Sequence, residues 1–271
     1  MADGLFTVLD DGRLLPGEHS RGPWSENALH GGPVAAMVGR AAEAALRATG
    51  SPAVEPVRLT LDLERPVPLA PLVVDAAVVR GGRKVQVAEV TVCDGDGRRL
   101  VRASVLAIRR ALLELPGERV APDDAPPPPK EAAFDDPMWE PLGAMTAFHK
   151  DGAEHRIVAG GFSKLGPTTD WIRLAVAVVA GETPSPFQRV VAAADFVNGI
   201  SSVLPFEQWT FINPDLTVAL HRLPVGEWIG VDATTRLDPG GVGTAEADLF
   251  DETGRIGRSV QTLLVEPVDQ C

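Results

Sequence analysis

The chain has 271 residues, of which 45% are hydrophobic, enough for a sizeable core in one large domain or two smaller ones. Its net charge of −12 argues against binding nucleic acid or anionic membranes, since such binding depends on Lys and Arg. The two cysteines, Cys93 and Cys271, form neither a zinc set nor a disulfide framework, which predicts a reducing, cytoplasmic setting. We find no signal-peptide pattern and no apolar run of membrane-spanning length, and expect no membrane partner.

The N-terminal part is predicted to contain one helix followed by antiparallel strands. A strand-like opening, GLFTVLDDGRLLPG, leads through a turn to the helix. Asn27 or the glycines of HGG cap this helix, Pro33 suits its first turn, and Gly50 is placed to end it. Residues 57–67 alternate as a strand does, and residues 71–110 are typical of three strands. Apolar residues recur at helical spacing at Val34, Met37, Val38, Ala41, Ala42, Ala45 and Leu46.

Two short sequences recur later in the chain. LTLDLER at 59–65 resembles LTVALHR at 216–222, and DGDGRRLVRASV at 94–105 resembles DETGRIGRSVQ at 251–261. Both matches have the same offset along the chain, which indicates a duplicated unit. Between the copies lies APDDAPPPPKEAAFDDP, whose consecutive prolines favour an extended spacer.

The predicted fold class is α+β, with two repeats joined through their sheets. Residues 1–120 form the N-terminal repeat, 121–137 the acidic, proline-rich linker, and 138–271 the C-terminal repeat, whose helix is expected at 185–204. A sheet with one apolar face must cover it, and a long antiparallel sheet wrapped around a central helix does so. Two such units side by side bury a sheet edge, an arrangement known as a double hotdog.

Five motifs follow one another along nearly the whole chain: the HGG helix, the acidic–proline linker, AADFVNG, NPDLTVALHRLPVGEW and GRSVQ. This order resembles the acyl-CoA thioesterase II-like proteins, which are double hotdogs. The resemblance implies hydrolysis of acyl-CoA to a free carboxylic acid and CoA, without a cofactor. In that family an Asp, a Thr or Ser, and a Gln activate the attacking water, and the matching positions include Asp195 for the acid and Gln261 for the amide.

The hydroxyl position departs from the family pattern. Asn213 stands where the family usually has Thr or Ser, and Thr217 supplies the only nearby hydroxyl. Strand period two places Asn213, Asp215 and Thr217 on one face. We therefore expect either Asn213 or Thr217 to orient the water.

The HGG turn predicts the place where substrate binds and the oxyanion forms. A helix N-terminus offers unpaired N–H groups and a positive dipole to a developing negative charge. We expect Gly31 and Gly32 to let the thioester carbonyl approach the backbone, with the Gly32 N–H as a donor. His30 would line the entrance or polarise the carbonyl. Asp195, in a partly apolar cleft, would serve as the general base.

Each candidate also has a purely structural interpretation. Asp195 could stabilise a helix N-terminus, Gln261 could be an exposed strand residue, and Thr217 could only favour a strand, as its match Thr60 does. We expect no functional role for His155. The tryptophans either line an acyl tunnel or fill the core, at Trp24, Trp171 and Trp209.

Two other functions compete with the thioesterase. A hotdog hydratase is the closest enzyme alternative, and we disfavour it. A non-catalytic acyl-CoA or lipid-binding double-hotdog protein is the alternative, and Asn213 keeps it open. In either case we expect an acyl-CoA ligand, no metal, no nucleic acid, and a homodimer formed through exposed sheet edges.

Overall fold

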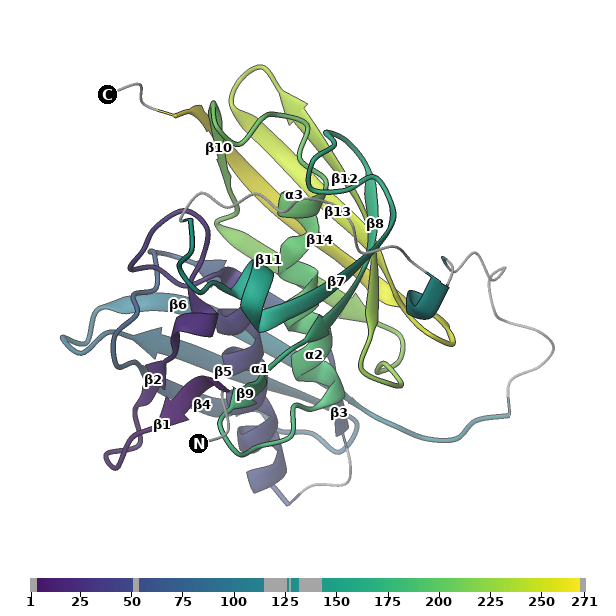
Figure 1. The fold of residues 1–271 in the computed structure, drawn as a ribbon. Coiled ribbons are helices and arrows are strands. Elements are labelled where there is room, and N and C mark those ends of the chain that lie inside the picture. Colours follow the sequence, from purple (N-terminus) through teal and green to yellow (C-terminus); the bar gives the residue numbers. More distant parts are fainter. Residues whose placement is uncertain (1–3, 51–53, 115–125, 127, 132–142, 269–271) are drawn as a thin grey trace.

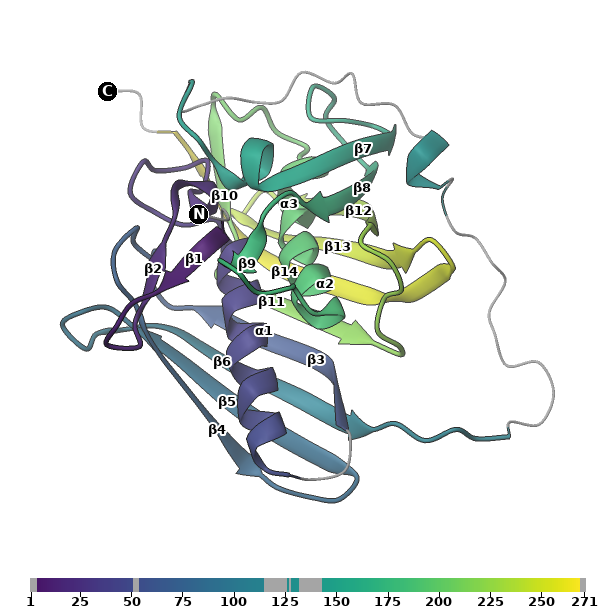
Figure 2. The same ribbon diagram turned by 60° about the horizontal axis from the view of Figure 1, so that its bottom comes forward.

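The computed structural model describes residues 4–50, 54–114, 126, 128–131 and 143–268 (Figure 1). The linker predicted at 121–137 therefore lies largely outside the described residues. The chain folds around one long antiparallel sheet, with helices packed on one of its faces (Figure 2). None of the helices in the described ranges is long and apolar enough to cross a membrane.

The N-terminal part supplies one long helix and the strands that it covers. The strands predicted at 57–67 and 71–110 form as β3 to β6, and Gly50, with a φ of 61°, follows the helix as expected. The elements are β1 (Gly4–Val8), β2 (Leu14–Pro16), α1 (Gly31–Ala48), β3 (Val54–Leu63), β4 (Val73–Arg80), β5 (Val85–Cys93) and β6 (Arg99–Arg109).

The C-terminal part begins with three strands that the sequence pattern did not predict, ahead of its helical segment. That segment is interrupted, because a 3-10 turn at Ala194–Phe196 separates two short helices where one helix at 185–204 was expected. The elements are β7 (Ala153–Ala159), β8 (Thr168–Leu174), β9 (Ala177–Val179), α2 (Pro186–Ala193), α3 (Val197–Ile200), β10 (Trp209–Ile212), β11 (Asp215–Leu220), β12 (Ile229–Asp238), β13 (Val242–Asp251) and β14 (Gly254–Pro267).

The two copies of the repeated sequence meet in the middle of the sheet. Its strands run in the order β4-β5-β6-β3-β11-β14-β13-β12-β8-β7, with β10 also paired to β14. β3 and β11 are antiparallel, and Thr60 lies opposite Thr217. Since these are matching positions of the repeat, the two parts are related by a local two-fold axis at this strand pair. A separate small sheet has the order β2-β1-β9.

Helix α1 is buried along most of its length between the sheet and the second helical segment, and its last turn is exposed at Arg47 and Ala48. It packs on β3 to β6 and against α2 (Figure 2). Small residues allow this close approach: a Cβ added at Gly39 would lie 3.3 Å from Phe187. The buried side chains of Met37 and Leu46 each contribute about 1.5–3 kcal/mol through burial.

His30, not Asn27 or a glycine, caps this helix, because its Nδ1 accepts a hydrogen bond from Gly32 N at 3.0 Å. Asn27 lies in the preceding loop, where its carbonyl oxygen accepts from Leu69 N at 3.0 Å. The capping histidine therefore sits directly beside the two glycines.

Arg222 makes a structural ion pair in the C-terminal part. Its guanidinium contacts both carboxylate oxygens of the buried Asp251, with Nη2 2.7 Å from Oδ1. Burial opposes ionisation of this carboxyl, but hydrogen bonds from Arg222, Val225 N and Thr253 outweigh it and lower the pKa of Asp251 to about 2.

Candidate functional site

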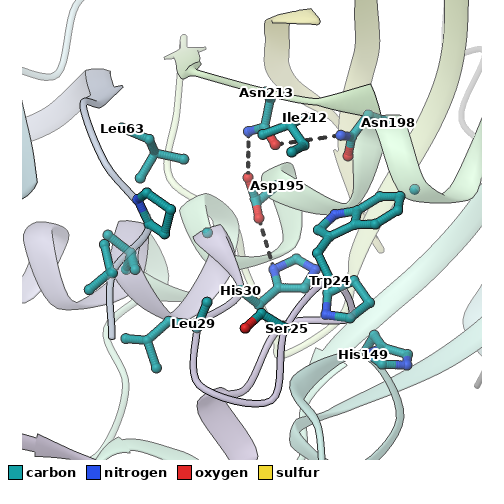
Figure 3. A pocket seen from close by; sticks show the side chains of 18 of the residues that line it. Trp24, Ser25, Leu29, His30, Leu63, His149, Asp195, Asn198, Ile212 and Asn213 are labelled. Carbon is teal, nitrogen blue, oxygen red and sulfur yellow. Dashed lines mark hydrogen bonds and ion pairs between the residues drawn. The ribbon is translucent and has the colours of Figure 1, made fainter. Parts of the chain in front are cut away.

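A buried carboxylate lies where the second helical segment is interrupted. Asp195 occupies the 3-10 turn between α2 and α3, and its side chain is 4% exposed. Its Oδ1 accepts hydrogen bonds from Asn213 Nδ2 at 3.0 Å and Gln261 Nε2 at 3.1 Å. Its Oδ2 lies 2.8 Å from His30 Nδ1 (Figure 3). The fold thus brings together three segments that are far apart in the sequence.

The two glycines allow the N-terminus of α1 to touch this turn. A Cβ at Gly31 would lie 2.7 Å from both carboxylate oxygens of Asp195, and one at Gly32 would lie 2.7 Å from the carbonyl oxygen of Ala192. Any side chain at either position would push the carboxylate or the helix away. Close packing by itself therefore requires glycine at both positions.

His30 holds the carboxylate and the helix end through one nitrogen. Nδ1 accepts from Gly32 N at 3.0 Å and lies 2.8 Å from Asp195 Oδ2. One ring nitrogen cannot be both acceptor and donor, so a proton between Nδ1 and Oδ2 belongs either to Asp195 or to His30. If His30 carries it, the Gly32 N–H loses its acceptor. Proton position and the availability of this backbone donor are thereby linked.

Gln261 is a buried amide rather than an exposed strand residue. It is fully buried on β14, and its Oε1 accepts from Asn198 N at 3.2 Å while Nε2 donates to Asp195. These two contacts fix which end of the amide faces the carboxylate. Asn198, which the sequence analysis did not single out, also donates through Nδ2 to the Phe211 carbonyl oxygen at 3.2 Å. Its position in the AADFVNG motif, three residues after Asp195, is the sequence feature that could have marked it as part of the site.

The prediction that Asn213, Asp215 and Thr217 share one face is wrong. Asn213 lies between β10 and β11, followed by Pro214, so strand alternation does not extend through it. Asp215 instead accepts from Thr262 N at 2.8 Å on an exposed part of the sheet.

Thr217 lies on the sheet face opposite to Gln261. It sits between the fully buried Leu216 and Val218 and pairs with Val260, which is 36% exposed. Its hydroxyl is therefore directed away from Asp195, and among the two candidates only Asn213 reaches the carboxylate.

A cavity of about 330 Å³ opens over this cluster and is lined mostly by apolar and aromatic side chains (Figure 3). Trp24 packs edge-on against Phe211, with ring centroids 5.4 Å apart. Trp24 thus lines the cavity, whereas Trp171 packs in a separate cluster with Trp228, and Trp209 packs against the main core. The polar side chains in the lining are those of Ser25, His30, Glu64, Arg65, His149, Asp195, Asn198 and Asn213.

A second buried acid–histidine pair lies behind the cavity wall. His155 Nδ1 is 2.5 Å from Asp170 Oδ2, and both side chains are almost fully buried. The His155 ring packs edge-on against Phe196, the residue after Asp195, at 4.8 Å between ring centroids. The pair therefore supports the turn that carries Asp195. Within the described part of the chain, no group of three or more His, Cys, Asp or Glu is arranged to hold a metal ion.

A long antiparallel sheet with helices on one face, and a buried acid–amide cluster beneath an open apolar cavity, place the chain among hot dog-fold proteins. Residues 20–108 match the acyl-CoA thioesterase N-terminal domain, and residues 122–265 match the acyl-CoA thioesterase C-terminal domain. The chain belongs to the acyl-CoA thioesterase family. No curated protein matches it in sequence.

Solved structures agree in fold. A provisional thioesterase II from Thermobifida fusca YX is 19% identical, with a TM-score of 0.74, 96% of this chain and 95% of that chain covered. A conserved protein of unknown function with a hot dog fold, from Alicyclobacillus acidocaldarius, has 18% identity, a TM-score of 0.70 and coverages of 96% and 93%. An acyl-CoA thioesterase II, TesB2, from Mycobacterium marinum has 18% identity, a TM-score of 0.63 and coverages of 89% and 91%. At these identities the similarity shows the fold alone.

Proposed function

We propose that this chain hydrolyses acyl-CoA to a carboxylic acid and CoA, with a water activated at Asp195. The observation that carries the proposal is the buried carboxylate held by Asn213, Gln261 and His30 at the edge of an apolar cavity. The amides of Asn213 and Gln261 orient the carboxylate and do not titrate. The acyl chain would occupy the apolar cavity, and the thioester carbonyl would face the N-terminus of α1.

Each group has a defined part in the reaction. Asp195 removes a proton from water, whose oxygen attacks the thioester carbonyl carbon. Negative charge develops on the carbonyl oxygen, and the N-terminal N–H groups of α1 at Gly31 and Gly32 stabilise it. The carbon–sulfur bond then breaks, and the proton on Asp195 passes to the departing CoA thiolate. His30 positions the carboxylate and, when it carries the Nδ1 proton, frees the Gly32 N–H for the oxyanion.

The overall arrangement supports a double hotdog with repeats at 1–120 and 138–271, which we include in the proposal. The central pairing of Thr60 with Thr217 favours it, because it joins matching strands of the two copies. Only the second copy provides Gln261, since Ser104 occupies the matching position of the first. One half would therefore be catalytic and the other would complete the cavity. The homodimer and the cytoplasmic setting stay predictions.

The test is thiol release from a series of acyl-CoA chain lengths by the wild-type protein and by Asp195→Asn, Asn213→Ala and Gln261→Ala. Thr217→Val is the matched control, since Thr217 faces away from the cluster. Loss of turnover in the first three variants, with folding and acyl-CoA binding retained, supports the proposal. Tight binding of acyl-CoA by the wild type without turnover would instead favour the non-catalytic binding protein.

A further inference from the structure

Arg65 is placed where the cavity opens. Among the described residues that line the cavity, it is the one Lys or Arg. It follows the end of β3, and its side chain is 49% exposed. Nη1 donates to the Arg99 carbonyl oxygen at 2.9 Å, which holds the guanidinium at the rim without neutralising it.

We infer that Arg65 binds a phosphate of the CoA part of the substrate and selects CoA thioesters over thioesters on shorter carriers. The inference rests on the proposed function for its substrate, and it goes further by assigning a specificity role to a residue outside the acid–amide cluster.

Comparison of the two repeats shows that Arg65 is not the structural residue that its counterpart is. Arg222, at the matching position, is paired through two nitrogens with the buried Asp251. The residue that matches Asp251 is Asp94, whose Oδ1 accepts from Asp96 N at 3.0 Å and Arg98 N at 2.9 Å. Asp94 therefore stabilises its own turn, and the guanidinium of Arg65 remains half exposed.

Neighbouring acids are already paired with other arginines. The Glu64 carboxylate is 3.9 Å from Arg65 Nη1 but 2.8 Å from Arg99 Nη2, and Asp62 pairs with Arg102 at 2.9 Å. A hydrogen bond from Arg99, together with the charges of Arg99, Arg102 and Arg65, lowers the pKa of Glu64 below its usual value. Each of these two acids is thus held more closely by another arginine, and neither lies within hydrogen-bonding distance of the Arg65 guanidinium.

An anion is the ligand that this guanidinium fits. Guanidinium groups bind phosphate through paired N–H donors, and a chain of net charge −12 needs local positive charge to hold a polyanion such as CoA. Because Arg65 is at the rim, the anion should lie outside the apolar cavity, on the carrier rather than on the acyl chain. A carboxylate at the far end of an acyl group is the other possible source of the anion.

The experiment compares wild type, Arg65→Gln and Arg65→Lys, with Arg236→Gln as a control in an exposed arginine outside the cavity lining. Calorimetry measures binding of CoA, 3′-dephospho-CoA and pantetheine. Where turnover is present, KM and kcat are measured with butyryl and succinyl thioesters of CoA and of pantetheine. Binding does not require turnover, so a failure of the proposed hydrolysis leaves this test intact.

We expect Arg65→Gln to weaken CoA binding, and to raise KM for butyryl-CoA, by about tenfold at low salt. The kcat, pantetheine binding and the Arg236→Gln control should be unchanged, and Arg65→Lys should recover part of the loss. Weakening by added salt should be smaller in the variant. Unchanged CoA binding, or an equal loss with pantetheine, would overturn the inference, as would a loss confined to succinyl thioesters.

Discussion

Gly31→Ala tests the close contact between α1 and the acid more sharply than removal of the acid itself. The added Cβ would lie 2.7 Å from both oxygens of Asp195, about 0.7 Å short of the ordinary contact distance of 3.4 Å. Replacing Gly by Ala in a helix gains at most about 1 kcal/mol of helix propensity. Overpacking of this kind costs about 1–3 kcal/mol, so the net free energy of unfolding should fall.

The same displacement should damage the proposed chemistry. Moving the carboxylate by a large part of an ångström disturbs its contacts with His30, Asn213 and Gln261, and we expect kcat/KM to fall about 100-fold. Urea titration measures the stability change, and thiol release from acyl-CoA measures the activity. Gly39→Ala in the same helix is the matched control, since its Cβ would meet Phe187 at 3.3 Å, away from the acid.

A double-mutant cycle separates the clash from other effects of the alanine. In an Asp195→Ala background the carboxylate is gone, so adding Gly31→Ala should cost nothing or stabilise the protein slightly. The two changes are therefore expected to be strongly coupled in the free energy of unfolding. An equal cost of Gly31→Ala in both backgrounds would refute the close-contact argument.

Three further predictions concern other parts of the chain. Asn213→Ala should lower kcat about 100-fold, while Thr217→Val stays near wild type; equal losses in thiol-release assays would contradict the assignment. His155→Leu should cost about 3 kcal/mol in urea titration, because the buried Asp170 carboxylate loses its histidine and keeps only the hydrogen bond from Arg156 N, and His155→Leu/Asp170→Leu should recover most of the loss. The Asp251 pKa of about 2 lies below its ordinary value of 3.8, so this carboxylate stabilises the fold above about pH 4 and the contribution, about 2 kcal/mol, is lost as the pH falls to 2. Urea titrations of wild type and Asp251→Asn should converge over that range, and parallel curves would show that Asp251 is not responsible.

Local patterns in the sequence were sufficient to predict helix α1 and the strands that it covers. Helical spacing of apolar residues located α1, and alternation located the strands β3 to β6, because these periods reflect burial of one face of a continuous element. Two motif matches with a common offset identified the duplication, which the pairing of Thr60 with Thr217 makes visible in the sheet. The family resemblance pointed to Asp195 and Gln261, which the fold brings within hydrogen-bonding distance.

Alternation failed where the element was not continuous. A period of two residues holds only along one strand, and the chain bends at Asn213 and Pro214 between β10 and β11. The side chain of Asn213 therefore turns toward Asp195, while that of Thr217 does not.

What the sequence determined by itself was helix α1 with strands β3 to β6, the duplication and the family, because each depends on residues close together in the chain or on the order of motifs. Tertiary structure alone decided which distant groups meet. The register of β7 against β8 sets His155 diagonally across from Asp170. Packing of α1 against the turn after α2 sets Gly31 against Asp195. Both contacts depend on where separate elements dock, which is governed by burial and packing over the whole core rather than by local sequence.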